Sequence, residues 1–465
     1  MRDMNRRSFM AAGLGASLTA ATAGSGAADG ESADERRTHR GVWREPARDI
    51  PVAGESDVVV CGGGPAGIAA AISAARAGAS VRLIEANGCL GGIWTAGLVP
   101  YIIRAQRESC LMDEIWRRMG EQYDSRLPHF NPEDMKVLLE AMCEEAGVSF
   151  QLHTRVAAAA TENGRLHYAV TESKSGRQAW RGKLFIDTTG DGDLGALAGN
   201  GYDFADEETG LFQPSSLNCL VAGLDPDDVA GIDRWAMQEE LQQAGVAPSY
   251  GVMGASLFYV GAGLYFLQAT HQYGYRVFDS AKEQTRATVE GRAENHRMVH
   301  ALRELGGKWK NIVLVATAEQ IGNREGRRLH GLATVTREDL KEGREQPDPA
   351  VSGVTYLMNI HPVTLEGNPP EIRQRQAPVK SYDIPFRALV AKDVDGLLMA
   401  GRCISGDFFA HGSYRVTGYA VPMGATAGVA GALAAQTDCL PHELPWETIR
   451  DKRREVRAAH SPTDE

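Results

Sequence analysis

The alternation of apolar and polar residues becomes regular at about residue 57. Residues 58–60 form a short apolar run with the character of a buried strand, and residues 68–77 have the small side chains of a tightly packed helix, which Gly78 ends. A second apolar run follows at residues 81–84. Short apolar strands on either side of a helix are typical of a parallel sheet that helices cover. The pattern therefore predicts a compact βαβ unit.

Further elements follow this unit. Apolar residues at helical spacing predict a helix over residues 132–146, and a strand follows at 148–152. Three segments separated by turn residues predict a β-meander, and a buried strand comes after them: residues 156–161, 165–172, 178–180 and 183–186. Strand character of this kind returns at residues 397–401, before an Ala/Gly-rich helix over residues 421–435. We therefore expect one domain to be built from two separate parts of the chain.

The first residues have the pattern of an export signal. Arg6 and Arg7 stand in an Arg-Arg-x-Phe-Met context and precede a weakly apolar Ala/Gly-rich stretch, with small-residue cleavage sites up to Ala27. This arrangement is typical of a twin-arginine signal peptide, which addresses a folded protein to the twin-arginine translocon. The alternative is a disordered basic leader. We expect the mature chain to be periplasmic or extracellular.

Composition excludes several classes of protein. The chain has 465 residues and a formal net charge of -11 at pH 7, and such a surface repels nucleic acid. No apolar run after the N-terminal signal is long enough to span a bilayer, so we expect no integral membrane segment in the mature chain. The 7 cysteines include no C-x-x-C pair and no His/Cys cluster at zinc spacing, so we expect no metal site.

A glycine-rich turn carries the clearest chemical signal. The turn between the first strand and the first helix reads Gly-Gly-Gly-Pro-Ala-Gly. Gly62 permits the tight turn, Gly64 lets the backbone approach a pyrophosphate, and Gly67 lets the helix pack on the sheet. Pro65 and Ala66 open the helix whose N-terminal amides face the phosphates. The turn therefore predicts a dinucleotide site.

Glu85 ends the second strand, where an acidic residue binds the ribose hydroxyls of a dinucleotide. With this acid and the glycine turn, the chain resembles the FAD-dependent oxidoreductase family with a glutathione-reductase-type FAD domain, and it is distantly similar to the fumarate reductase and aspartate oxidase flavoproteins. The resemblance extends over nearly the whole mature chain, and the matching stretches are residues 58–67, 85, 90–97, 186–193, 320–328 and 397–428. The resemblance implies FAD as the cofactor.

The resemblance also implies roles for residues outside the glycine turn. It places a Gly-Gly-x-x-Thr segment near the flavin and Asp407 at the ribitol side of FAD. It also implies that a helix begins at Gly424 and Ala425 and points at the flavin pyrimidine carbonyl. The remaining FAD contacts that we expect are Gly91, Gly92, Thr95, Val156, Thr189, Gly190 and Asp191.

The elements and motifs together predict an α/β protein, with a discontinuous Rossmann-like FAD-binding domain that contains the β-meander and a mixed α+β substrate domain. The substrate domain is assigned to the part of the chain in which the glycine signature does not recur. The expected boundaries are a signal peptide at 1–27, a linker at 28–55, the FAD-binding domain at 56–200 and 388–440, the substrate domain at 201–387 and a polar C-terminal tail at 441–465.

Four residues are candidates for the substrate chemistry. His411 and Arg415 form a His-Gly-x-x-Arg element similar to one near the substrate in the fumarate reductase group. We expect His411 to exchange a proton with the substrate and Arg415 to hold a carboxylate or another oxyanion. Alternatively, both hydrogen-bond FAD or neighbouring backbone. His361 and Arg324 are further candidates, although Arg324 could instead pair with the neighbouring glutamate, whereas His271 is interpreted as a core residue.

We predict an exported FAD-dependent dehydrogenase or oxidase that transfers a hydride between a small polar organic substrate and the flavin. We recognise no second Gly-x-Gly-x-x-Gly of the kind that binds a nicotinamide dinucleotide, so the electron acceptor is unknown. The segment at 189–192 is similar to that of flavin hydroxylases, but residues 400–402 depart from their pattern, so hydroxylase chemistry is less favoured. Two alternatives stay open: a lyase, hydratase or isomerase that uses FAD without net redox change, and a secreted FAD-binding protein.

Overall fold

The computed structural model describes residue 43 and residues 45–103, 110–123 and 129–460. Ile50–Glu465 forms one compact unit, which holds every described helix and strand. The expected signal peptide at 1–27 and most of the expected linker lie outside the described residues. Among the described residues, no helix is both long and apolar enough to cross a membrane.

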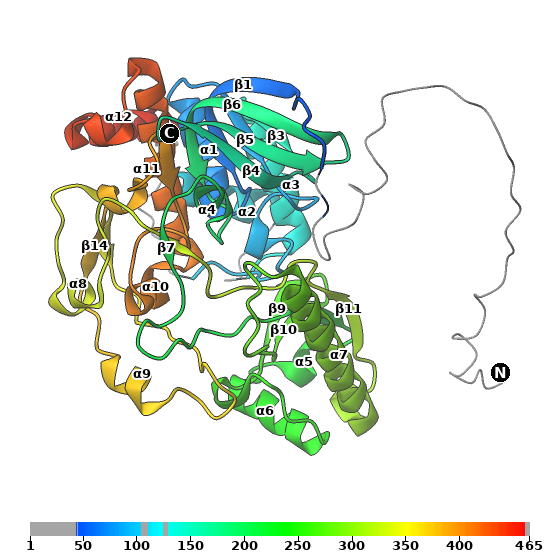
Figure 1. Cartoon of the computed structure of the whole chain (residues 1–465). Coiled ribbons are helices and arrows are strands. Elements are labelled where there is room, and N and C mark those ends of the chain that lie inside the picture. The colour runs from blue at the N-terminus through cyan, green and yellow to red at the C-terminus, as the bar shows by residue number, and fades with distance from the viewer. Residues whose placement is uncertain (1–42, 44, 104–109, 124–128, 461–465) are drawn as a thin grey trace, which may run out of the picture. The chain divides into compact units, whose positions relative to one another are not determined.

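A seven-stranded sheet runs through the upper half of this unit, in the order β3-β2-β1-β6-β5-β4 with β15 also paired to β6 (Figure 1). Its parallel strands are β1 (Val52–Cys61), β2 (Val81–Ile84), β3 (Ser149–Gln151) and β15 (Leu397–Met399), which all run with β6 (Gly176–Asp187). The antiparallel meander consists of β4 (Arg155–Glu162), β5 (Arg165–Ser173) and β6. The predicted α/β class, with a sheet that combines distant parts of the chain, is confirmed.

Strand β6 is longer than the sequence suggested. We expected separate strands at 178–180 and 183–186, but one strand covers both. It pairs with β1 on one side, and on the other side with β5 along its first half and with β15 along its second half. A Cβ at Gly182 would come within 3.0 Å of the side chains of Phe185 and Val59. Because Gly182 has no side chain, it avoids this steric clash, and β6 continues through the position.

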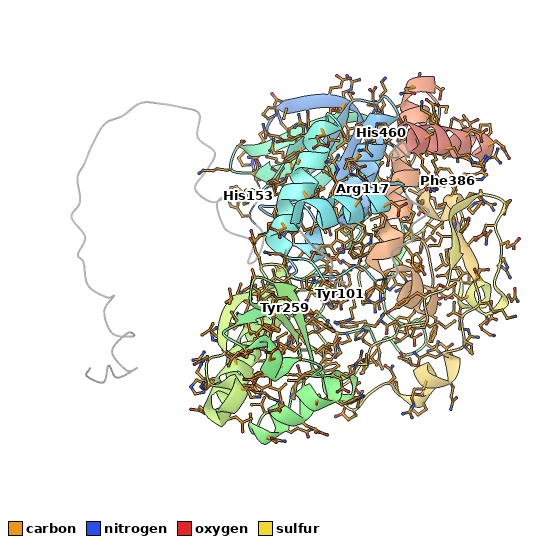
Figure 2. The ribbon with its side chains drawn as sticks, turned by 180° about the vertical axis from the view of Figure 1, so that it is seen from behind. Tyr101, Arg117, His153, Tyr259, Phe386 and His460 are labelled. Carbon is orange, nitrogen blue, oxygen red and sulfur yellow. The ribbon has the colours of Figure 1, made fainter. Side chains whose placement is uncertain are left out.

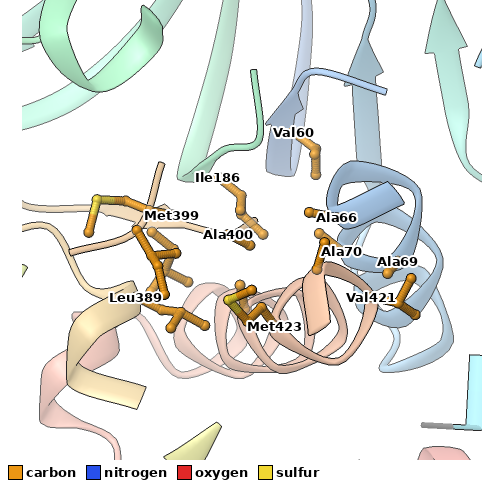
Figure 3. Packing of buried hydrophobic residues seen from close by; sticks show 14 of the residues in the cluster. Val60, Ala66, Ala69, Ala70, Ile186, Leu389, Met399, Ala400, Val421 and Met423 are labelled. Carbon is orange, nitrogen blue, oxygen red and sulfur yellow. The ribbon is translucent and has the colours of Figure 1, made fainter. Parts of the chain in front are cut away.

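Two helices lie side by side against one face of the sheet. They are α1 (Pro65–Arg76) and α11 (Thr417–Thr437), and Figure 3 shows apolar side chains of β1 and β6 pointing toward them. A Cβ on Gly424 would lie 2.1 Å from the carbonyl oxygen of Ala66, and one on Gly428 would lie 2.2 Å from that of Ala70. The small residues therefore allow a contact between helix backbones that larger side chains would prevent.

Two more helices complete this half of the unit, α2 (Cys110–Tyr123) and α3 (Pro132–Glu145). In α3 the apolar residues at helical spacing are buried as the pattern predicts, and Asn131 caps its N-terminus by accepting a hydrogen bond from the amide of Glu133. Glu114 of α2 forms an ion pair of 2.8 Å with Arg76 at the end of α1. These contacts hold α2 and α3 beside α1.

A second, antiparallel sheet has the strand order β11-β8-β10-β9. Its strands are β8 (Cys219–Ala222), β9 (Ser256–Gly261), β10 (Leu264–Gln268) and β11 (Val313–Thr317). The long helix α7 (Ala281–Leu305) and the shorter α6 (Arg234–Gln243) share one apolar core with this sheet, in which Val221, Leu267 and Met298 are fully buried. In Figure 1 these elements are the green ones below the larger sheet.

The remaining elements, apart from the C-terminal helix, are short. They are the strand pairs β7 (Tyr202–Asp203) with β12 (Arg328–Leu329) and β13 (Pro349–Val354) with β14 (Tyr382–Pro385); the helices α4 (Asp193–Leu197), α5 (Pro226–Val229), α8 (Arg337–Glu342), α9 (Pro370–Arg375) and α10 (Phe408–Tyr414); and 3-10 turns at Gly92–Trp94, Gly251–Met253, Gly307–Trp309, Phe386–Leu389 and Pro441–Glu443.

Both described ends of the chain differ from the expected boundaries. β1 begins at Val52, inside the expected linker, and α12 (Trp446–His460) occupies much of the expected polar tail. Ile449 of this helix is fully buried, and the ring of Trp446 stacks on Phe386 at 6.1 Å. Two apolar anchors therefore dock a helix whose other residues are mostly polar, which explains why composition alone suggested a tail.

Candidate active site

A cavity of about 1330 Å³ opens where the parallel strands of the large sheet end. Residues that directly follow four of these strands line it: Gly62 after β1, Glu85 after β2, Thr188 after β6 and Ala400 after β15. The carboxyl ends of parallel strands are the usual ligand site of such sheets. Ligand pockets commonly measure ~300–1,000 Å³. This cavity is therefore large enough for a dinucleotide together with a small substrate.

The glycine turn has the shape that a pyrophosphate requires. Gly62 adopts φ +105°, and a Cβ on Gly67 would lie only 1.7 Å from the carbonyl oxygen of Gly62, so the strand and the helix meet without side chains between them. Gly64 has no atom within 4 Å of its ideal Cβ position and lines the cavity beside Pro65 and Ala66. The turn thus leaves open the space that phosphates would take, next to the N-terminal amides of α1.

Glu85 lies at the cavity and is buried. Its Oε2 accepts a hydrogen bond from the amide of Gly63 at 2.5 Å, and its Oε1 accepts from the backbone and side-chain nitrogens of Asn87 at 2.7 and 2.8 Å. Burial raises the pKa of this carboxyl, while the hydrogen bonds from Asn87 and Gly63 oppose that rise. Oε2 retains a lone pair for a ribose hydroxyl, so its setting fits the predicted role.

The segment after β6 forms another wall. Thr189, Gly190 and Asp191 line the cavity, as does Val156 at the start of the meander. Asp191 accepts a hydrogen bond from Arg402 at 2.7 Å and another from the side-chain amide of Asn323 at 2.9 Å. These contacts join three segments that are far apart in sequence. The residues present fit a bound FAD along this side of the cavity.

Three expected contacts are structural supports of the site. Thr95 donates its hydroxyl hydrogen to the carbonyl oxygen of Leu90 at 2.6 Å, and a Cβ on Gly91 would meet the Thr95 side chain. Of the Gly-Gly-x-x-Thr segment, Gly92 is the residue that lines the cavity. Gly91, Thr95 and, as described above, Gly67 therefore shape the loops around the cavity from behind.

Asp407 does not take the predicted position at the ribitol side of FAD. It is the N-cap of α10, where its carboxylate accepts hydrogen bonds from the amides of Ala410 at 2.8 Å and Arg337 at 2.5 Å. It faces a separate cavity of about 220 Å³. The error arises because Asp407 follows the last strand at the expected spacing, whereas α10 uses it as a cap and turns it away.

The helix start predicted at Gly424 and Ala425 is also wrong. α11 begins two turns earlier, with Val416 as its N-cap, and Val416, Thr417 and Ala420 line the cavity. Gly424 lies inside the helix, against α1. A helix N-terminus therefore does face the cavity, as the resemblance implied, but different residues form it.

His411 is not in a position to touch a substrate. It lies inside α10, is fully buried and is outside the described lining of the large cavity. Neither ring nitrogen has a hydrogen-bond partner among the described residues, and Nδ1 is 4.0 Å from Oε1 of Glu325. Burial, with the nearby charges of Arg328 and Arg415, lowers the pKa of His411 well below its usual value. His411 is therefore a neutral core histidine.

The other three candidates meet at one end of the large cavity. Arg415 donates to the carbonyl oxygen of Asn359 at 2.9 Å and to Oε1 of Gln213 at 3.1 Å. The same Gln213 oxygen accepts the backbone amide of His361 at 3.0 Å. Arg324, only 9% exposed, donates to the carbonyl oxygen of Pro214 and to the hydroxyl of Ser216 at 2.9 Å. Arg324, His361 and Arg415 all line the cavity, so sequence reasoning chose residues that the fold does assemble.

Neither guanidinium group has a carboxylate partner within 4.0 Å among the described residues. The ion pair considered for Arg324 is absent there, because Glu325 pairs with Arg328 at 2.6 Å instead. Burial first, and then the charge of Arg324, lower the pKa of Arg415 to about 10. The same two cations, after burial, lower the pKa of His361 well below its usual value. This end of the cavity therefore carries excess positive charge beside a neutral imidazole.

Several residues of this end were not candidates from the sequence, in which His271 was interpreted as a core residue. Tyr250, Tyr356 and Asn359 line the cavity near His361, and His271 lies directly behind it. Tyr101 also lines it, with its ring edge-on to Phe258 of the second sheet, and Figure 2 shows Tyr101 close to where the two sheets meet. These residues come from segments without a motif, so only the folded chain identifies them.

The chain is similar to a flavin-dependent brominase, to a monooxygenase and, over a short stretch, to a thiamine thiazole synthase. A flavin-dependent brominase is 12% identical, with a TM-score of 0.47 over 87% of this chain and 84% of that chain. The p-nitrophenol 4-monooxygenase from Pseudomonas putida is 12% identical, with a TM-score of 0.42 over 88% of this chain and 87% of that chain. A stretch of 63 residues is 46% identical to thiamine thiazole synthase from Aeropyrum pernix; it spans 13% of this chain and 23% of that protein.

A match to a protein family covers almost all of the described unit. The family model with the description "FAD dependent oxidoreductase" matches residues 57–453. This span contains the glycine turn, Glu85 and the arginine and histidine residues at the far end of the cavity. FAD is therefore the cofactor, as the glycine turn and the resemblance predicted. The chain belongs to the family of FAD dependent oxidoreductases.

Proposed function

We propose that this enzyme is an exported FAD-dependent dehydrogenase or oxidase for a small polar substrate that carries an anionic group. The observation that supports it most is the pair of cavity-lining guanidinium groups, Arg324 and Arg415, without a carboxylate partner among the described residues. A buried, uncompensated cation is unfavourable, and a bound anion would remove much of that penalty. A substrate carboxylate fits both the charge and the forked geometry of an arginine.

The residues around this anion site have separate tasks. FAD, when bound, supplies the acceptor for the hydride that leaves the substrate. Arg324 and Arg415 hold the anionic group, and Gln213 ties Arg415 to the backbone of His361 through one shared oxygen. His361 is neutral, so its ring can accept a proton from the substrate, the task that the sequence had assigned to His411.

The test is an anaerobic screen of small hydroxy and amino acids that reads the loss of flavin absorbance. A net redox reaction predicts stoichiometric bleaching, whereas a lyase, an isomerase or a binding protein would leave the flavin oxidised. With a substrate identified, His361→Gln should keep bound FAD and slow flavin reduction by about a hundredfold or more. Arg415→Ala should instead raise the substrate concentration needed for saturation, and Arg415→Lys should restore it only in part.

His330→Gln is the matched control for the histidine variant. His330 lies outside the described lining of the cavity, is 40% exposed and pairs with Asp203 at 3.1 Å. This variant should reduce its flavin at the wild-type rate. If His361→Gln and His330→Gln behaved alike, His361 would not be the proton acceptor. If Arg415→Ala lost FAD, Arg415 would belong to the cofactor site.

Export and the electron acceptor complete the proposal. The Arg6–Arg7 context supports secretion of the folded holoenzyme through the twin-arginine translocon, to the periplasm or beyond. The chain has two Gly-x-Gly-x-x-Gly matches, and only the one at Gly62–Gly67 opens a strand–helix–strand unit that ends in an acid. The other, Gly190–Gly195, leads into the short helix α4 at the wall of the same cavity. This supports an acceptor other than a tightly bound nicotinamide dinucleotide. We therefore propose that the reduced enzyme passes its electrons to a separate molecule outside the cytoplasm.

A further inference from the structure

A buried chain of hydrogen bonds leads away from the cavity through His361. Its Nδ1 lies 3.2 Å from Nε2 of His271, and Nδ1 of His271 lies 3.1 Å from the hydroxyl oxygen of Tyr273. That hydroxyl donates to the carbonyl oxygen of Ser249 at 3.1 Å. His271 is 2% exposed and His361 is 7% exposed. The chain thus starts at a cavity wall and ends on a backbone carbonyl.

The far end of this chain sets the direction of every hydrogen bond in it. A backbone carbonyl can only accept, so the single hydroxyl hydrogen of Tyr273 points to Ser249. The Tyr273 oxygen must then accept from His271, which places a hydrogen on Nδ1 of His271. Burial lowers the pKa of His271 far below its usual value, so this ring is neutral and its Nε2 has no hydrogen.

The position of the hydrogen on the His361 ring follows in the same way. Because Nε2 of His271 accepts, Nδ1 of His361 must donate and carries the hydrogen. His361 is also neutral, so its Nε2 presents a lone pair. Its described neighbour there is the side-chain nitrogen of Asn359 at 3.5 Å, the outer limit of a hydrogen bond. Nε2 is therefore poised to accept from a better donor in the cavity.

We propose that His271 and Tyr273 are positioning residues that fix His361 in the Nδ1–H tautomer, so that Nε2 accepts a hydrogen bond from the hydroxyl or amino group of an anionic substrate held by Arg324 and Arg415. The tautomer assignment concerns the free holoenzyme, while the substrate class rests on the proposed function. An anion with a neighbouring hydroxyl or amino group satisfies both arginines and the lone pair at once. An anion without such a donor would leave Nε2 with only its long contact to the Asn359 nitrogen at 3.5 Å.

The tautomers are tested by nitrogen NMR on the substrate-free holoenzyme labelled with ¹⁵N-histidine, since protonated and unprotonated ring nitrogens differ widely in chemical shift. His361→Gln and His271→Gln assign the two rings. We expect both rings in wild type to carry hydrogen on Nδ1, with the other tautomer at least about tenfold less populated, because it would strand a buried donor. A hydrogen on Nε2 of His361 in wild type would overturn the proposal.

Tyr273→Phe tests the origin of the bias. Without the hydroxyl, Nδ1 of His271 loses its acceptor, so the population ratio of the two His361 tautomers should fall by about tenfold. Tyr275→Phe is the matched control, because the Tyr275 hydroxyl bonds Glu290 at the surface, and it should leave both rings unchanged. An unchanged His361 spectrum in folded, FAD-loaded Tyr273→Phe would overturn the role of Tyr273. The wild-type spectrum decides the tautomer even if this variant fails to fold.

The NMR result and the proposed function can fail separately. The tautomers are measured without substrate, so the result of that measurement does not depend on whether any anion reduces the flavin. If hydroxy and amino acids leave the flavin oxidised but Nδ1 of His361 carries hydrogen, the function is wrong and the positioning holds. If an anion with no hydroxyl or amino group reduces the flavin as fast as its hydroxylated analogue, the substrate assignment is overturned.

Discussion

Gly64 and Gly67 are three positions apart and meet different surroundings. A Cβ on Gly64 would point into open space, whereas one on Gly67 would strike the Gly62 carbonyl. We therefore expect Gly64→Val to fold but to lose bound FAD, because its branched side chain occupies the phosphate space. Gly67→Val should instead lower the stability of the apoprotein. Flavin absorbance after purification and thermal unfolding of the apoprotein separate the two effects.

An FAD-free Gly67→Val protein with wild-type thermal stability would contradict this division, as would a full complement of FAD in Gly64→Val. The contrast matters because both glycines belong to one motif. The motif predicts a cofactor, but it does not say which glycine faces the ligand and which serves the packing. The structure assigns these tasks through the space beside each Cα atom.

At the residue scale, the sequence predicted best where the site is continuous along the chain. The glycine turn and Glu85 could be read because one βαβ unit presents them at fixed spacing. Arg324, His361 and Arg415 come from three distant segments, and their meeting depends on tertiary structure. His411 was chosen because it shares a His-Gly-x-x-Arg element with Arg415. In the structure His411 lies inside α10 and faces the core, whereas Arg415, the C-cap of α10, lines the cavity.

At the scale of elements, the contact of α1 with α11 gives a second test. Gly428→Ala places a methyl group 2.2 Å from the carbonyl oxygen of Ala70, so the helices must separate. We expect a loss of unfolding free energy of ~1–3 kcal/mol. Gly431→Ala is the control in the same helix, since its methyl group would meet the nearest atoms at 3.6 Å. Replacing glycine inside a helix then gains ~0.5–1 kcal/mol. Chemical denaturation of both variants measures the difference, and equal stabilities would contradict the close contact.

The elements that sequence patterns predicted are those with a strong apolar period. The helix and second strand of the βαβ unit, α3 and the first two strands of the meander were all expected close to their observed bounds. The continuous β6 was not, because strands on both sides pair with β6 beyond Gly182. The first residues of α11 were not expected either, because they line the cavity rather than continue the Ala/Gly pattern that packs on α1. Composition also missed α12, which two apolar anchors dock.

At the scale of the whole molecule, the FAD site depends on both ends of the fold. Gly64 lies near the start of the compact unit, whereas Arg402, just after β15, and Thr417 of α11 line the same cavity from near its other end. The strand β15 completes the sheet only by pairing with β6. The site therefore cannot form before almost the entire unit has folded. We therefore expect FAD to bind this enzyme where the cofactor is made, before the enzyme is exported.

Export of the folded, FAD-loaded enzyme is the prediction at this scale. A translocon that accepts folded proteins would carry the chain with FAD already bound, whereas a threaded chain would need the cofactor outside. Replacing Arg6 and Arg7 together by lysine keeps the charge of the leader but removes the twin arginines that the receptor reads. We expect the precursor to accumulate in the cytoplasm, soluble and yellow, while the wild-type protein is recovered outside it with FAD bound. Cell fractionation with flavin absorbance measures both. Unchanged export of the lysine variant would show that only a basic leader is needed, because charge is the one property that the substitution preserves.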